Sequence, residues 1–257
     1  MKTTAVRMVE AAGTWAHGDS EDAGVRRRLE ESGYSPDLGR SLGALTNGGQ
    51  EAVVQVIDAQ YGGILAHAAS VLTVVRQWAI GDDGAVTVRG TTLDIRLVTG
   101  QPRWVVTSVR PARPGRAIKE LSRAARALLA NDRVALPAAA TRDVRSGAID
   151  DVVLLALASL SGRRRIRVSV LRSGHPLRVF GTDRISNHTQ GLAVDVWALD
   201  GRSIIDTGNT PTVADFMKEA VDVGANQIGG PVDLDGGGVT YFSDDTHQDH
   251  IHLGFTI

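Results

Sequence analysis

Two short stretches in the last third of the chain bring histidines together with carboxylates. The first, "SNHTQGLAVD", contains His188 and Asp195, and the second, "HQDHIH", contains Asp249. Asp195 stands inside an apolar run typical of a buried strand, where a carboxylate is unfavourable unless it is paired or bound to a cation. The histidines of this region are His175, His188, His247, His250 and His252. Their grouping with two acids indicates a site that holds a cation.

These residue types are the ones that a catalytic zinc site uses. Such a site takes three protein ligands, typically histidines and a carboxylate, and leaves one position for water. His188 and Asp195 could supply two ligands. His250 and His252 face the same side of an extended strand because side chains alternate, so either could be the third. Asp249 would then lie beside the ion and accept a proton from the bound water.

At these residues the chain resembles the zinc D,D-peptidases of the peptidase M15 family, which share a fold with the Hedgehog signalling domain. "SNHTQGLAVD" matches the family pattern Ser-x-His-x-x-Gly-x-Ala-x-Asp, and "HQDHIH" matches His-x-Asp-His-x-His. The resemblance covers residues 117–257, and nothing before them resembles the family. It implies an α+β domain of the Hedgehog/DD-peptidase type, with an antiparallel sheet and flanking helices.

The resemblance also implies a role for each residue of the two motifs. The zinc ligands would be His188, Asp195 and His252, and Asp249 would be the general base because it lies three residues before the third ligand. His247 matches a histidine near the reacting carbonyl.

Arg172, in "LRSGHP", matches the arginine that steadies the tetrahedral intermediate. Its guanidinium could stabilise the developing oxyanion or hold a terminal carboxylate of the substrate. Ser186 and His250 are expected beside the ligands without binding the ion.

Structural interpretations stay open beside the metal site. Asp195 could be a buried acid paired with Arg172 or Arg184, and the alternating histidines of the second stretch could be polar residues on an edge strand. The first interpretation leaves "HQDHIH" unexplained. His175 follows Gly174 in a turn and is expected to be structural.

The predicted function is a zinc-dependent peptidoglycan peptidase, a hydrolase that cuts amide bonds in stem peptides as a D,D-carboxypeptidase or an endopeptidase. The alternative is a catalytically silent, zinc-containing module that binds the cell wall or a protein, because the family tolerates silent members such as the Hedgehog domain. Either function places the protein in the cell wall or outside the cell. The first 22 residues are not typical of a signal peptide, so the export route is open.

The composition argues against several other functions. Because the chain has no cysteine, disulfides, thiolate nucleophiles and cysteine-ligated zinc sites are excluded. A net charge of −1 and an aromatic content of 4% are not typical of a nucleic-acid-binding protein. No apolar run approaches the roughly 20 residues of a membrane-spanning helix. We therefore expect no nucleic-acid partner and no membrane span.

The elements that must position the two motifs alternate between helical and extended patterns. The expected helices are residues 117–130, 146–162 and 212–224, and the expected strands are 165–174, 192–199, 239–244 and 250–257. Before them, residues 1–112 are expected to form a smaller domain with helices at 20–33 and 35–49 and an antiparallel β-meander from residue 51. The meander looks like the curved sheets of NTF2-like or cystatin-like modules, and a docking role with a partner is the interpretation for this half. "RPARPGR" (110–116) is expected to be the linker.

Overall fold

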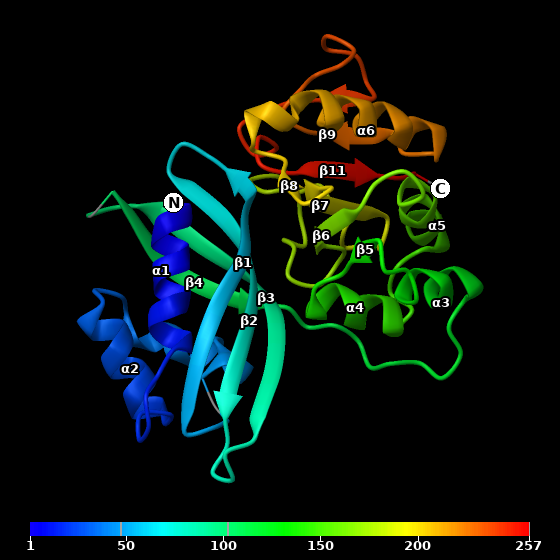
Figure 1. The fold of residues 1–257 in the computed structure, drawn as a ribbon. Helices are drawn as coiled ribbons and strands as arrows, with labels where there is room; N and C mark the ends of the chain where they lie inside the picture. The colour runs from blue at the N-terminus through cyan, green and yellow to red at the C-terminus, as the bar shows by residue number, and fades with distance from the viewer. Residues whose placement is uncertain (47, 102, 257) are drawn as a thin grey trace. The chain divides into compact units, whose positions relative to one another are not determined.

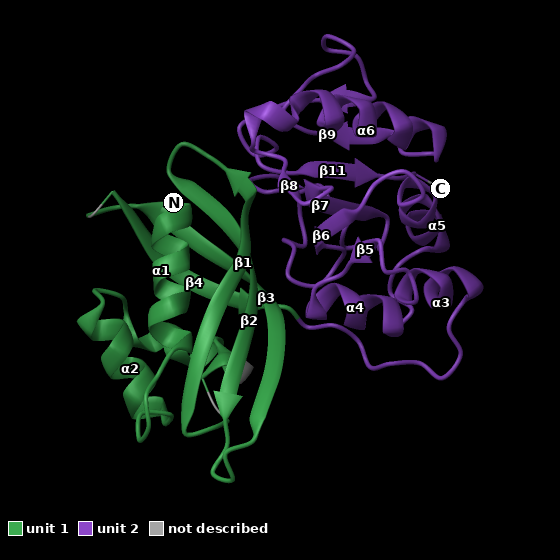
Figure 2. Ribbon diagram, in the orientation of Figure 1, with its two compact units in different colours: residues 1–112 green, residues 113–257 purple. Residues whose placement is uncertain are grey.

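The computed structural model describes residues 1–46, 48–101 and 103–256. The chain has a mixed α+β structure, as expected from the sequence, and divides into two compact units, Met1–Ala112 and Arg113–Ile257 (Figure 1, Figure 2). No helix among the described residues is long and apolar enough to cross a membrane.

Unit 1 is a four-stranded antiparallel sheet preceded by helices. The strands follow the order β1-β2-β3-β4, which is the meander expected from residue 51 onward. Its elements are α1 (Lys2–Gly13), α2 (Asp22–Glu31), the 3-10 turns η1 (Pro36–Ser41) and η2 (Gly43–Leu45), β1 (Glu51–Ile64), β2 (Ala68–Ile80), β3 (Val86–Thr99) and β4 (Trp104–Pro111).

The core of unit 1 lies between its helices and one face of the sheet. Met8 of α1 and Leu29 of α2 belong to the same buried cluster as Val71 of β2 and Leu93 and Ile95 of β3. Leu93 and Ile95 are two residues apart, so their side chains leave the strand on the same face. The alternation in the sequence therefore gives the sheet one apolar face for the helices.

Unit 2 places a mixed sheet beside helices. The sheet order is β10-β9-β11-β7-β6-β5, and β8 pairs with β7. The elements are α3 (Arg123–Leu129), β5 (Val134–Ala135), α4 (Ala138–Arg145), α5 (Asp151–Leu160), β6 (Ile166–Val170), β7 (Ala193–Leu199), β8 (Arg202–Ser203), η3 (Thr207–Asn209), α6 (Thr210–Asp222), β9 (Gln227–Gly229), β10 (Tyr241–Phe242) and β11 (Ile251–Gly254).

The sheet of unit 2 is only partly antiparallel, which corrects the expectation of an antiparallel sheet. Its four inner strands pair antiparallel, but β5 pairs parallel with β6 and β10 pairs parallel with β9. Helices α4 and α5 lie between β5 and β6, and such a crossover returns the chain in its original direction. The parallel pairs are thus confined to two short strands at the ends of the sheet order.

Several expected helices are shorter or divided. The segment expected as a helix over 146–162 becomes helical at Asp151, because Gly147 has a φ of 68° and Asp150 caps the helix through a bond from the backbone N–H of Val152. The segment expected as a helix over 35–49 instead contains the two 3-10 turns η1 and η2, and Gly43, which begins the second, has a φ of 52°. Positive φ values end a right-handed helix, and the sequence patterns did not reveal them.

Candidate metal centre

The candidate ligands come from a turn and two neighbouring strands of unit 2. Asp195 lies in β7 and His252 in β11, and the antiparallel register places these two residues directly opposite each other. His188 lies in the turn before β7, which returns through Gly191 at a φ of 76°. A Cβ atom on Gly191 would stand 2.2 Å from the carbonyl oxygen of Ala148, so only glycine fits this turn.

Three ligand atoms converge within this arrangement. The Nε2 atom of His188 lies 3.1 Å from Oδ1 of Asp195 and 3.1 Å from Nδ1 of His252. The distance between Nδ1 of His252 and Oδ1 of Asp195 is 3.0 Å. In a tetrahedral zinc site with bonds of about 2.0–2.1 Å, ligand atoms lie roughly 3.3–3.4 Å apart. The donor set and its spacing therefore fit one small divalent cation.

The second nitrogen of His188 is held by the backbone. Its Nδ1 atom lies 2.5 Å from the carbonyl oxygen of Leu171, and because a carbonyl only accepts, Nδ1 carries the proton. The lone pair of His188 is then on Nε2, which faces Asp195 and His252. A carbonyl that fixes the tautomer of a ligating histidine is a common feature of protein metal sites. The hydroxyl of Ser186 accepts a bond from the backbone N–H of His188 at 3.3 Å, and its expected place beside the bound ion stays a prediction.

Burial controls the charge of these groups. Burial favours a raised pKa for Asp195, but the neighbouring His188 and His250 hold that pKa well below its usual value. Burial lowers the pKa of His252 to about 4, against the opposing effect of its hydrogen bond to Asp195. At neutral pH the group thus combines a carboxylate with a neutral imidazole at His252, which are the forms that bind metal ions.

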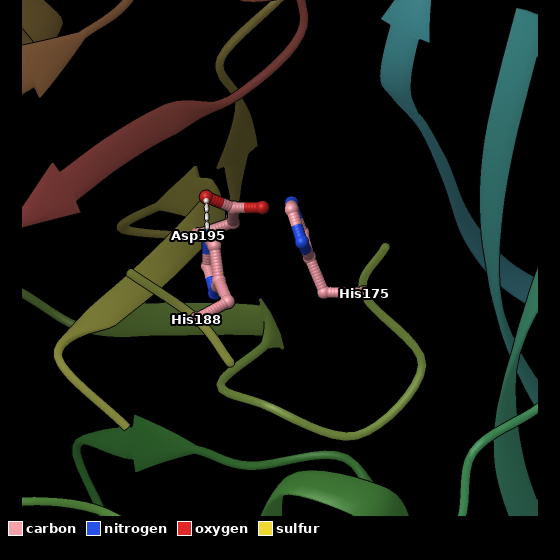
Figure 3. A group of neighbouring side chains, drawn as sticks. All are labelled: His175, His188 and Asp195. Atoms are coloured by element: carbon pink, nitrogen blue, oxygen red, sulfur yellow. Dashed lines mark hydrogen bonds and ion pairs between the residues drawn. The ribbon is translucent and has the colours of Figure 1, made fainter. Parts of the chain in front are cut away.

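His175 also lies at this centre, although the sequence analysis treated it as a structural turn residue. One ligand atom from each of His175, His188 and Asp195 lies within 4.8 Å of the other two, and Figure 3 shows the ring of His175 directed toward the Asp195 carboxylate. The turn that brings it there follows β6, and no local spacing in the sequence reveals this approach. The only available signal was its membership of the histidine-rich region.

The ring orientations distinguish His175 from His252 as a third ligand. The rings of His175 and His188 stack, with centroids 3.9 Å apart and planes 18° apart. A metal ion binds imidazole in the plane of the ring, so two stacked rings cannot both reach one ion at about 2.1 Å. The rings of His188 and His252 are tilted by 58°, and their ligand atoms converge. The geometry thus favours His252 as the third ligand, with His175 lying over the ring of the first.

Asp249 reaches the centre through His250. The Asp249 carboxylate is buried and lies 2.6 Å from Nδ1 of His250, while Nε2 of His250 lies 3.8 Å from Oδ2 of Asp195. His250 therefore lies between the two acids, and its expected role as a residue beside the ion that does not bind it stays a prediction. The role of Asp249 as general base stays a prediction.

The two remaining predicted residues lie around the ligands. The ring centroid of His247 is 5.8 Å from that of His252 and 5.0 Å from that of His250, and its Nδ1 contacts Asp244 at 2.7 Å. Arg172 donates from Nε to the carbonyl oxygen of Thr189 at 3.0 Å, which ties it to the turn that carries His188. The predicted contacts of His247 and Arg172 with a substrate stay predictions.

Comparison with known proteins does not assign the chain to a family. No family model matches it, and no curated protein matches it. Among solved structures, it is similar to the association domain of C. elegans CaMKII, with 18% identity over 27% of this chain and 55% of that chain and a TM-score of 0.23. An NTF2-like superfamily protein from Salmonella enterica has 12% identity over 44% of this chain and 76% of that chain, with a TM-score of 0.26. The matched region spans about half of the CaMKII domain, and TM-scores this low carry no conclusion about fold or function.

Proposed function

We propose that unit 2 is a zinc-dependent peptidase of the M15 type that hydrolyses amide bonds in peptidoglycan stem peptides. The observation that supports this most directly is the convergence of His188, Asp195 and His252, whose ligand atoms lie 3.0–3.1 Å apart. These are the residues that the two motifs select. The stem peptide is the inferred substrate because the resemblance implies it, and this function would place the protein in the cell wall or outside the cell.

The proposed mechanism assigns one task to each group. His188, Asp195 and His252 would hold the zinc ion, which would supply a Lewis acid for the scissile carbonyl and for the attacking water. Asp249 accepts the proton of the attacking water and later gives it to the amine that leaves when the C–N bond breaks. His250 holds the Asp249 carboxylate in place through its Nδ1 atom. Arg172 and His247 stabilise the oxyanion or hold the substrate.

A second candidate is a zinc-containing module that binds wall peptide or a protein without cutting it. One observation favours this alternative. Asp249 is buried, and a hydrogen-bonding distance of 2.6 Å to His250 already engages its carboxylate. A base must reach the proton that it removes, so an engaged carboxylate would have to exchange this contact for the water.

Digestion of purified cell-wall sacculi, with and without a chelator, tests the proposal. We expect the full-length protein to release peptides only without chelator, and mass spectrometry of the new termini identifies the bond that is cut. Asp249→Asn should keep stoichiometric zinc and lose on the order of 10²–10⁴ in rate, because the proton acceptor is removed. Asp183→Asn, which changes a fully exposed carboxylate, is the control and should cut at the normal rate.

The outcomes separate the two candidates. Stoichiometric zinc with no cleavage at high protein concentration supports the binding module and contradicts the peptidase. Undiminished cleavage by Asp249→Asn removes Asp249 from the mechanism while leaving the metal centre in place.

A further inference from the structure

A buried carboxylate outside the ligand group holds the turn beneath it. Asp143 lies in α4 and is completely buried. Its Oδ2 atom accepts bonds from the backbone N–H of Ser173 at 2.7 Å and of Arg172 at 3.2 Å, and its Oδ1 atom accepts from the hydroxyl of Ser173 at 2.5 Å. Asp143 has no part in the proposed mechanism. A buried carboxylate lowers the stability of the fold unless it is fully hydrogen-bonded, so these three bonds are needed to keep Asp143 in this place.

The turn that Asp143 holds, residues 171–175, contacts the metal centre at both ends. The carbonyl of Leu171 accepts a hydrogen bond from Nδ1–H of His188, and the ring of His175 stacks on the ring of His188. Between these two contacts stand Arg172 and Ser173, the residues whose N–H groups bind Asp143. A shift of the turn would therefore move the acceptor of the His188 proton and the stacked ring together.

A carboxylate suits this position better than any similar side chain. The turn presents three donors, and a carboxylate is purely an acceptor with room for all of them. An asparagine of the same size would place an NH₂ group against one of these donors. The requirement is thus for acceptors at a fixed place on α4, which sets where the turn lies.

We propose that Asp143 is a positioning residue of the metal centre: it fixes turn 171–175 so that the Leu171 carbonyl accepts a hydrogen bond from Nδ1–H of His188, which leaves the Nε2 lone pair directed at the proposed cation position. The inference rests on the proposed function only for the presence of that cation. The orientation of His188 is a property of the metal-free protein and can be measured separately.

The test compares Asp143→Asn with wild type in the full-length, ¹⁵N-labelled protein. Long-range ¹H–¹⁵N correlation in the metal-free state reports which nitrogen of His188 carries its proton, and chelator competition reports the affinity for Zn²⁺. We expect the wild type to hold the Nδ1–H tautomer. Asp143→Asn should mix the two tautomers and bind Zn²⁺ roughly 10–100-fold more weakly, the usual loss for a residue that supports a ligand.

Two further variants keep the test decisive. Ser173→Ala removes the hydroxyl donor and retains both N–H bonds, so it should fold and show the same changes to a smaller extent. Ser122→Ala removes the cap of α3, which costs about 1 kcal/mol of stability, and should change neither the tautomer nor the Zn²⁺ affinity.

Each outcome decides the proposal. The proposal is overturned if folded Asp143→Asn keeps the wild-type tautomer of His188 and the wild-type affinity for Zn²⁺. If Asp143→Asn does not fold, the same result in Ser173→Ala overturns it. Equal changes in Ser122→Ala also overturn it, because they would reflect stability alone. If the protein binds no Zn²⁺, the proposed function is overturned. The positioning role is still supported in that case if the tautomer of His188 is fixed in wild type and mixed in Asp143→Asn.

Discussion

The two sheets of the molecule each carry an aspartate in the middle of a strand, and the two aspartates have different partners. In unit 1, Asp94 of β3 accepts from Nε and Nη2 of Arg96 at 2.9 and 2.7 Å and from the hydroxyl of Ser70 at 2.7 Å. In unit 2, Asp195 of β7 faces His188 and His252. A guanidinium is permanently charged, so the first group is a complete ion pair. The pKa of His252 is about 4, so this partner brings no charge at neutral pH. The contrast is therefore between a closed ion pair in one unit and, in the other, a carboxylate among histidines that fits the proposed cation site.

The largest expected effect separates the two aspartates. Asp195→Asn should abolish stoichiometric zinc binding, because it removes the only anionic ligand of the proposed set. Asp94→Asn should retain zinc and lose about 1–3 kcal/mol of unfolding free energy in unit 1, because the arginine loses its counter-charge. Elemental analysis measures the first effect. Added zinc should raise the melting temperature of Asp94→Asn and leave that of Asp195→Asn unchanged. Normal zinc content in Asp195→Asn would contradict the role of Asp195 as a metal ligand.

A second expected difference concerns pH in the metal-free protein. The pKa of His252 is about 4 in the folded chain and 6.5 in a free imidazole, so the unfolded chain binds more protons between these values. The stability of the strands around His252 should therefore fall as the pH falls from about 6.5 to about 4, by at most about 3 kcal/mol. Hydrogen exchange, corrected for its intrinsic pH dependence, can follow β7 and β11 with β2 and β3 as internal reference. An equal decline in both units would contradict a cause at His252.

The smallest expected effect comes from substituting alanine for two glycines that have the same backbone conformation. Gly84 in unit 1 has a φ of 77° and Gly191 in unit 2 a φ of 76°. A Cβ atom at Gly84 meets nothing within 4 Å, whereas at Gly191 it would stand 2.2 Å from a backbone carbonyl oxygen. Gly84→Ala should cost about 1–2 kcal/mol, the strain of the left-handed conformation alone. Gly191→Ala should cost more and also weaken Zn²⁺ binding, because the turn carries His188. Chemical denaturation and chelator competition measure the pair, and equal losses of stability would contradict the close approach.

Spacing in the sequence pointed to His188 and Asp195 and left His250 and His252 open as the third ligand, and the family resemblance selected His252. His188 and Asp195 lie in one motif, and His252 is in a short strand whose register places it opposite Asp195, so the three meet. His175 escaped prediction because its position depends on the turn after β6, which is held by a carboxylate far away in the sequence. The α+β class followed from alternating patterns, but the parallel end strands did not, because two-residue strands leave no periodic signal.

The position of β11 in the sheet has a consequence for how the unit is assembled. It is the last strand to be synthesised among those described, yet it lies between β9 and β7. Until it inserts, both neighbours expose unsatisfied backbone donors and acceptors, and the third candidate ligand is missing. A nascent or clipped chain without residues 251–254 therefore lacks both a finished sheet and one of the three candidate ligands. Completion of the sheet and completion of the proposed ligand set are thus a single late event.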